Sequence, residues 1–412
     1  MTSEIKFISS QKGKRKLIYK NYVFQKDNQR GNNSYWACDK KGSKNCMAWI
    51  VLINNEFSTE NLKEHNHLPD QLKIQTEEFK IKLKRTVQEN PVNSLKNIYD
   101  SVFSNEVKRL KQNNYSDLEI GTILKPFKSV QTILNYEKHK YIPNQPENRR
   151  DISINGDYML TKKNESFLLI DTNDEERIFV FCINNFFKIM CDTDTIFMDG
   201  TFNTVPKIYT QLYTLHGFFK DQMIPFIYIL LPDKKLTTYL RIFRLLQDKA
   251  LELGLVFAPK TFQIDFETAV IRAINTIYPS SNIKGCLFHF SQAILRNISI
   301  KGLTEYRNND NLHKLVRRTS ALPFLPIEKI WYVWDEIMEL SDRTDEKVVK
   351  FLDYVTDTWI YQPLFEPTIW NHYRNYSTRT NNHLEGWHNS LNKKAGGSHK
   401  NFFEFINLLK DQ

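Results

Sequence analysis

Between residues 195 and 290 the chain alternates strand-like and helix-like runs, and this order restricts the fold more than any other feature. Three strand-like runs come first, namely "TIFM", "IYTQLYTLHGFF" and "MIPFIYILLP". A helix-like run, "TTYLRIFRLLQDKALELG", ends at Gly254, a residue suited to a helix C-terminus. The strand "TFQI", a helix from about Glu267 to Tyr278 and the strand "IKGCLFHF" follow. This order predicts an α/β core with a mixed sheet.

Two aspartates follow strands of this core. Asp199 comes directly after the first strand and Asp265 after the fourth. In the ribonuclease H fold these two strands are neighbours, so a ribonuclease H-like, mixed five-stranded sheet would bring the two carboxylates together. Hard oxygen ligands of this kind can hold two Mg²⁺ or Mn²⁺ ions roughly 3.5–4 Å apart over a phosphate. Each aspartate alone is also a common turn residue.

A third carboxylate, Glu385, lies in the stretch "RTNNHLEGWH" near the end of the chain. It could meet the two aspartates, or it could be an ordinary residue on an exposed helix. Arg379 could face a phosphate or contribute only to solvation. Thr380 or Asn382 could cap the helix that contains Glu385.

The first 70 residues are basic and contain short alternating segments separated by Gly and Asn. They carry twelve Lys and Arg against seven Asp and Glu. Two pairs of metal-binding residue types fall here, in "CDKKGSKNC" and "HNH". A hairpin could join the pairs into one tetrahedral zinc site. The alternative is two buried thiols and two surface histidines. The four residues are Cys38, Cys46, His65 and His67.

The composition limits the class of protein. The chain has 412 residues and is 41% hydrophobic, which supports a buried core in two or three domains. Its formal charge of +10 favours a polyanionic partner, although a lysine-rich surface would give the same balance. No long apolar run or signal-peptide-like N-terminus occurs, so we expect a soluble protein that is not secreted. Five cysteines in a chain this long favour metal or core roles over a disulfide scaffold.

The N-terminal region resembles the FLYWCH zinc finger over about residues 5–68. The positions that carry this likeness are Phe7, Leu17, Tyr22, Trp36, Cys38, Cys46 and the final His-x-His pair. The resemblance implies that Cys38, Cys46, His65 and His67 bind Zn²⁺ and that the module contacts nucleic acid or protein. A basic strip could contact DNA phosphates, or it could be a solvated face. The strip consists of Lys12, Lys14, Arg15, Lys16 and Lys20.

Later blocks of the chain resemble, in order, the MULE (Mutator-like element) transposase domain. They are "DGTF", "QLYTLHG", "DFE", "GCLFHFSQAILR", "ALPFLP" and "RTNNHLEGWHNSL", with "ENRRDI", "FLLID" and "RIFVF" as a lead-in. Together with the finger, the likeness extends from about residue 5 to residue 403. The family belongs to the DDE transposases, so the resemblance implies that Asp199, Asp265 and Glu385 hold Mg²⁺ or Mn²⁺. Glu385 would follow a helical insertion at about residues 291–378.

The resemblance also implies a domain organisation and a set of partners. We expect a finger at 1–70, a helical DNA-binding or linker region at 71–150 and the transposase domain at 151–412. The partner would be double-stranded DNA with the terminal repeats of a transposon, and the active form a homo-oligomer in the nucleus. The reaction would be metal-dependent DNA strand cleavage and transfer. The alternatives are a domesticated, catalytically silent DNA-binding regulator and a protein-interaction module.

The family's Cys-x-x-His pair is matched by Cys286 and His289. Two ligands do not complete a zinc shell, so a zinc site here would need partners such as His383 or His388. The interpretation that we favour is a buried thiol with a histidine that forms hydrogen bonds near the acids or contacts DNA.

Overall fold

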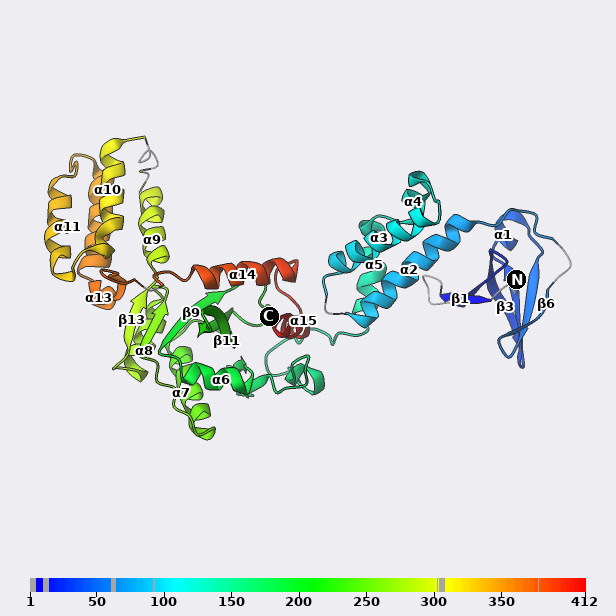
Figure 1. The fold of residues 1–412 in the computed structure, drawn as a ribbon, viewed down its shortest axis with the longest axis horizontal. Helices are drawn as coiled ribbons and strands as arrows, with labels where there is room; N and C mark the ends of the chain where they lie inside the picture. Colours follow the sequence, from blue (N-terminus) through cyan, green and yellow to red (C-terminus); the bar gives the residue numbers. More distant parts are fainter. Residues whose placement is uncertain are drawn as a thin grey trace. The chain divides into compact units, whose positions relative to one another are not determined.

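The computed structural model of the protein forms two compact units, Met1–Asn144 and Gln145–Gln412. Figure 1 shows the first unit in blue and cyan and the second in green to red. The structure describes residues 5–9, 15–60, 64–91, 93–301, 303, 308–376 and 378–412. No described helix is long and apolar enough to cross a membrane.

The first unit begins with a six-stranded sheet in which each strand pairs with the next, antiparallel throughout. One face of the sheet buries Leu17, Phe24, Trp36 and Ile50 together with the thiols of Cys38 and Cys46. The strands are β1 (Lys6–Ser9), β2 (Arg15–Tyr19), β3 (Tyr22–Arg30), β4 (Asn33–Cys38), β5 (Trp49–Ile53) and β6 (Glu56–Glu60), with α1 (Lys41–Lys44) between β4 and β5.

Four further helices follow the sheet in the described part of the first unit. They are α2 (Gln71–Glu89), α3 (Leu95–Gln112), α4 (Asp117–Ile123) and α5 (Phe127–Lys138). Apolar side chains at helical spacing meet in one core that includes Phe79, Leu83, Val102, Ile120 and Leu134. The long α2 packs against α3, α4 and α5. This region is therefore a small folded helical assembly.

The second unit is built on a seven-stranded sheet in the order β13-β12-β9-β10-β11-β8-β7. β9 pairs in parallel with β12, and β12 with β13, while the remaining pairs are antiparallel. The strands are β7 (Leu168–Asp171), β8 (Phe179–Phe181), β9 (Thr195–Thr201), β10 (Gln211–Phe219), β11 (Gln222–Leu231), β12 (Thr261–Ile264) and β13 (Asn282–Gly285).

Two details of the predicted sheet are wrong. The sheet has seven strands, not five, because β8 and β7 extend it beyond β11. These two strands come from the apolar runs "RIFVF" and "FLLID", and they pair backbone groups that β11 would otherwise leave open at an edge. The run "IKGCLFHF" is a strand only to Gly285, since α9 (Leu287–Ile300) begins two residues later. A short apolar run has no period that separates a strand from a buried helix.

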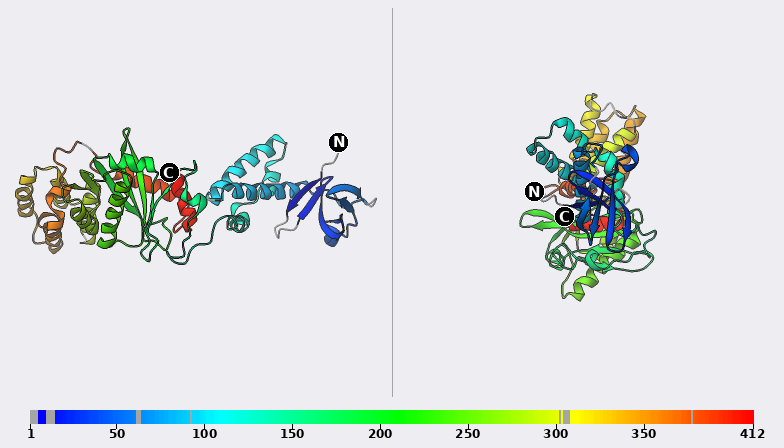
Figure 2. Two further views of the ribbon diagram at one scale, coloured as in Figure 1. Left: turned by 90° about the horizontal axis from the view of Figure 1, so that it is seen from below. Right: turned by 90° about the vertical axis from the view of Figure 1, so that its right-hand side faces the viewer.

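Helices cover both faces of this sheet. Ile196 and Met198 of β9 lie in a core with residues of α6 (Asn184–Cys191), α7 (Leu236–Glu252) and α8 (Thr268–Ile277). Side chains alternate along a strand, so Asp199 belongs to the opposite face. That face is covered by α14 (Asn382–Ala395), which packs against β9. This is the orange-red helix beside the green strands in Figures 1 and 2.

The chain between β13 and α14 forms a separate helical core. It buries Phe290, Trp334, Phe351, Trp359 and Trp370. Its helices are α9, α10 (Asp310–Ala321), η3 (Leu322–Phe324), η4 (Ile327–Lys329), α11 (Ile330–Glu339), α12 (Glu346–Val355), η5 (Thr356–Ile360), η6 (Pro363–Phe365) and α13 (Pro367–Trp370). The second unit also contains η1 (Gly156–Met159) and α15 (Phe402–Lys410).

Candidate metal centre and acidic cavity

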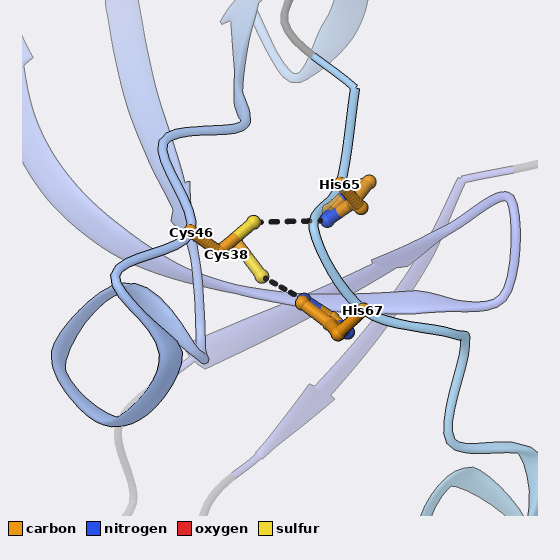
Figure 3. Close-up of side chains that lie close together, drawn as sticks. All are labelled: Cys38, Cys46, His65 and His67. Carbon is orange, nitrogen blue, oxygen red and sulfur yellow. Dashed lines mark hydrogen bonds between the residues drawn. The ribbon is translucent and has the colours of Figure 1, made fainter.

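The four predicted zinc ligands meet in the first unit (Figure 3). Cys38 ends β4, Cys46 lies between α1 and β5, and His65 and His67 follow β6. Cys38 Sγ lies 3.2 Å from His67 Nε2, and Cys46 Sγ lies 3.3 Å from His65 Nδ1. All four ligand atoms lie within 4.8 Å of one another. Tyr22 supports the histidines, because its ring stacks on His65 at 3.5 Å and its hydroxyl donates to the His67 carbonyl at 3.2 Å.

These distances fit a zinc ion. Zn–S bonds near 2.3 Å and Zn–N bonds near 2.0–2.1 Å give a tetrahedron whose S···N edges are about 3.6 Å. Burial, together with the neighbouring Cys46 thiol, raises the pKa of the Cys38 thiol to about 11. Two adjacent buried thiols therefore favour binding of a metal cation, which replaces their protons. A zinc-binding site at Cys38, Cys46, His65 and His67 fits the geometry.

The predicted basic strip is only partly within the described residues. Lys12 and Lys14 lie outside them. Arg15 is exposed on β2, with its guanidinium 3.8 Å from the centroid of the Phe7 ring. Lys16 is half-buried on the same strand. Lys20 is exposed in the turn after it, near the Tyr19 ring. Three of the five cations of the strip therefore lie on β2 or in the turn after it.

The three predicted acids line one cavity of about 470 Å³ in the second unit. Asp199 lies inside β9, and Asp265 directly follows β12, the parallel neighbour of β9. Glu385 occupies the first turn of α14, which packs against β9. Residues almost two hundred positions apart are thus brought together by the strand order and by one returning helix.

The electrostatics of this cavity show crowded negative charge. Burial, together with the carboxylates of Asp199 and Glu267, raises the pKa of Asp265 to about 6. Burial also raises the pKa of Glu385, with Asp199 adding to the effect and His289 opposing it. Burial would lower the pKa of His289, but Cys286 and the carboxylates of Asp199 and Asp265 outweigh it and raise that pKa to about 9.

The acids are more widely spaced than the zinc ligands. Among the described residues, the finger set alone brings three or more ligand atoms within 4.8 Å of one another. The wider spacing suits a pair of cations, because acids that bind different members of a pair roughly 3.5–4 Å apart need not share one coordination shell. Partly buried carboxylates with raised pKa values are hard oxygen donors that a divalent cation would neutralise.

The auxiliary residues take different positions. His289 Nε2 lies 3.5 Å from Glu385 Oε1, and His388 Nδ1 lies 3.4 Å from Asp199 Oδ2. Cys286 is fully buried and accepts a hydrogen bond from the backbone N–H of Asn381 at 3.1 Å. Arg379 donates to the Asn375 carbonyl at 2.6 Å and is absent from the described lining of the cavity.

The predicted caps of α14 are wrong, because Asn381 occupies the N-cap position. Its side chain makes no cap hydrogen bond and instead donates to the Met198 carbonyl of β9 at 3.3 Å. Asn381 is fully buried, so its side chain joins the helix to the strand that carries Asp199. This tie fixes the start of the helix beside the acidic cavity.

Glu267 is a cavity residue that the sequence did not single out. It lies two positions after Asp265 and lines the same cavity. Tyr239 donates a hydrogen bond to Glu267 Oε1 at 2.7 Å, and Lys234 Nζ lies 3.5 Å from Oε2. Gln211 Nε2 in turn donates to the Tyr239 hydroxyl at 2.6 Å. The sequence signal that could have identified Glu267 is the motif "DFE", because two carboxylates so close after a strand can face one site.

Comparison with known proteins agrees with this architecture. Residues 7–67 match the model of the FLYWCH zinc finger domain, and residues 195–293 match that of the MULE transposase domain. A search of curated proteins finds no significant match. The matched ranges contain the zinc set, Asp199 and Asp265, while Glu385 lies beyond them. The chain thus carries a FLYWCH zinc finger followed by a MULE transposase domain.

Proposed function

We propose that the protein is a Mutator-like transposase, or a descendant of one, that binds DNA and cleaves and transfers DNA strands with Mg²⁺ or Mn²⁺. The observation that carries this proposal is the convergence of Asp199, Asp265 and Glu385 on one cavity within a MULE-containing unit. The order β11-β10-β9-β12-β13 supports a ribonuclease H-like core, because it places the first and fourth strands side by side.

Asp199, Asp265 and Glu385 would hold the divalent cations. When bound, these cations would supply charge neutralisation at the phosphate and make the attacking oxygen more nucleophilic. Cleavage forms a bond from a water oxygen to phosphorus and releases the DNA 3′ oxygen as a hydroxyl. Transfer repeats the displacement with that 3′-hydroxyl attacking a second phosphodiester. No covalent bond to the protein is required, so the side chains act by position and charge.

Cations of the chain itself complete the cavity. Lys234 and Arg296 line it together with the acids. They can contact DNA phosphates that do not react, while the carboxylates occupy the reacting position. His289, with its raised pKa, keeps a positive charge beside Glu385 at neutral pH. The finger and the overall charge of +10 support a DNA partner, for which we propose transposon terminal repeats, bound in the nucleus by a homo-oligomer.

The test is a nicking assay with purified full chain, Mn²⁺ and duplexes that carry the termini flanking the gene. The wild-type chain should release nicked ends, and Asp199→Asn should not, while both bind the duplex. A wild-type chain that binds its termini but leaves every strand intact would overturn the catalytic part of the proposal.

The second candidate is a DNA-binding regulator without strand cleavage. The observation that favours it is that the transposase match ends at residue 293, before Glu385, while the finger match contains the whole zinc set. Intact strands together with salt-dependent duplex binding would support this candidate, because phosphate contacts release counterions. Binding that does not depend on salt would point to a protein partner.

A further inference from the structure

The helical region between the finger and the transposase domain contains a DNA-reading element of its own. We propose that α4 and α5 form a helix-turn-helix whose second helix enters the major groove of duplex DNA. Neither family match covers these residues. The inference rests on the DNA partner of the proposed function, but it is independent of strand cleavage.

The connectivity is that of a helix-turn-helix. The seven-residue α4 and the twelve-residue α5 are separated by the three residues 124–126. Motifs of this class join a short helix and a recognition helix through a 3–4-residue turn. Both helices pack against α2, the long helix seen in Figure 1, through Ile120, Ile123, Val130 and Leu134.

The turn is held firmly. Leu124 is buried, and the Tyr99 hydroxyl donates to the Lys125 carbonyl at 2.9 Å. The Ser129 hydroxyl donates to the Pro126 carbonyl at 2.7 Å, at the start of α5. At the other end, Ser116 and Glu119 form a capping box that fixes the first turn of α4. The position of α5 is therefore fixed at its start, and a helix that recognises bases in a DNA groove needs such fixed placement.

One face of α5 is open and polar. Its positions follow the i, i+3, i+4, i+7 spacing of a single helix face. The exposed residues on it are Lys128, Gln131, Thr132, Asn135, Tyr136 and, just after the helix, His139. Gln131 and Asn135 can each pair with an adenine edge through two hydrogen bonds, and Lys128 can contact a phosphate. The face therefore carries the side-chain types that read bases.

Negative charge is kept off this face. The one carboxylate of α5, Glu137, is buried and accepts hydrogen bonds from Gln88 at 2.8 Å and Lys140 at 2.9 Å. Residues 124–140 carry four Lys against this one Glu. The acids of α4 lie in its first turn, where Asp117 pairs with Lys111 at 3.2 Å and Glu119 caps Ser116. The charge on α5 suits a phosphate backbone.

A protein partner fits this face less well. The centres of protein interfaces are depleted of charge and enriched in aromatic and apolar groups. Here Tyr136 is the one large hydrophobic side chain among the polar residues of the face. The donors and acceptors of the remaining residues match the edges of base pairs.

The test is selection of binding sites from a random-sequence duplex library by zinc-loaded full chain. The variant is the double substitution Gln131→Ala and Asn135→Ala on the open face. Its matched control is Asn105→Ala with Gln112→Ala, which removes the same side chains from exposed positions on α3. The wild-type chain and the control should enrich one motif. The variant should bind that motif roughly tenfold or more weakly, with unchanged affinity for random duplex, because base contacts are lost and phosphate contacts are kept.

A further variant, Lys128→Ala, should weaken binding to all duplexes and lower the salt slope by about one ion. A double variant that enriches the wild-type motif with wild-type affinity would overturn the inference, as would a wild-type chain that enriches no motif. The wild-type chain could enrich a motif that the double variant loses and yet leave every DNA strand intact. This result would support the helix-turn-helix, and it would count against strand cleavage but not against DNA binding.

Discussion

His388 Nδ1 lies 3.4 Å from the Asp199 carboxylate, and this pair joins the returning helix α14 to the strand β9. The opposite ring nitrogen, Nε2, lies 3.2 Å from the Thr214 hydroxyl, which itself donates to the Asp199 carbonyl. Both side chains of the pair are almost fully buried. We therefore expect His388 to position Asp199, with Thr214 of β10 holding the far side of the imidazole.

Replacing His388 should weaken cation binding at Asp199. Residues that orient a metal ligand typically contribute 10–100-fold to metal affinity or activity. We expect His388→Ala to raise the Mn²⁺ concentration needed for half-maximal nicking by roughly this factor. Excess Mn²⁺ should restore part of the rate. The matched control is His383→Ala on the same helix. His383 is exposed, and its ring lies 6.3 Å from that of Phe218, so this variant removes an imidazole that does not support Asp199. Equal Mn²⁺ dependence in the two variants would argue against a positioning role.

Loss of one finger ligand should unfold the N-terminal sheet. Zinc binding and folding are one equilibrium in small modules of this kind, and Cys46 holds one corner of the site. We expect one zinc per wild-type chain by metal analysis, and less than that with rapid proteolysis before residue 70 in Cys46→Ser. Cys191→Ser, which changes a cysteine in the second unit, is the control and should keep its zinc. A Cys46→Ser chain with full zinc content and protease resistance would exclude Cys46 as a ligand.

The sequence was sufficient for features set by spacing along the chain. The pairs Cys38/Cys46 and His65/His67 stand on either side of one hairpin, β5–β6, so their meeting could be predicted. The order of strands and helices likewise placed the strands of Asp199 and Asp265 side by side. Both predictions depend on local patterns joined by short connections.

Features set by packing could not be read in this way. Arg379, for which the sequence left both a phosphate contact and solvation open, donates to a carbonyl four residues earlier. Asn381 uses its side chain on Met198, 183 positions away, in place of a cap. Glu267 gains its place through Tyr239 of α7. Each of these contacts depends on which elements lie together, and residue type alone does not determine that.

Gly285 should not tolerate a side chain. A Cβ at this position would lie 2.4 Å from ring atoms of Phe266. That ring cannot move easily, because it packs at 4.8 Å on Trp359 and at 5.8 Å on Phe365. We expect Gly285→Ala to destabilise the second unit by about 1–3 kcal/mol in thermal unfolding. Gly386→Ala is the control, since nothing lies within 4 Å and alanine favours the helix. Equal melting of both variants would contradict the close packing seen here.

Glu106 should make the helical region sensitive to acid. Burial would raise its pKa, but hydrogen bonds from Lys82 at 2.6 Å and Arg109 at 2.8 Å lower it below the ordinary value. A carboxyl whose pKa is lower in the folded chain stabilises it above the unfolded pKa of about 4.3, and this contribution is lost as the pH falls through the folded pKa.

We therefore expect Glu106→Gln to lower the stability of the first unit by about 1–3 kcal/mol at pH 7. The difference from wild type should shrink in acid, below pH about 4. Calorimetry of the full chain measures both. Glu89→Gln removes an exposed pair with Arg85 and should change the stability by less than about 1 kcal/mol. A Glu106→Gln difference that stays constant down to acid pH would contradict the role of the charge.

Glu385→Gln tests whether α14 supplies the third ligand. The change keeps the shape of the side chain and removes one negative charge from the cavity shared with Asp199 and Asp265. Nicking with Mn²⁺ should fall by orders of magnitude, because phosphoryl transfer of this type depends on the charge and position of the metal ligands. Duplex affinity should stay the same or rise slightly, since an acid facing phosphate is neutralised. The matched control is Glu252→Gln, which changes an exposed acid of α7 paired with Lys249. If Glu385→Gln nicks DNA at the rate of the wild type and of Glu252→Gln, Glu385 is a surface residue of the cavity and the third ligand lies elsewhere.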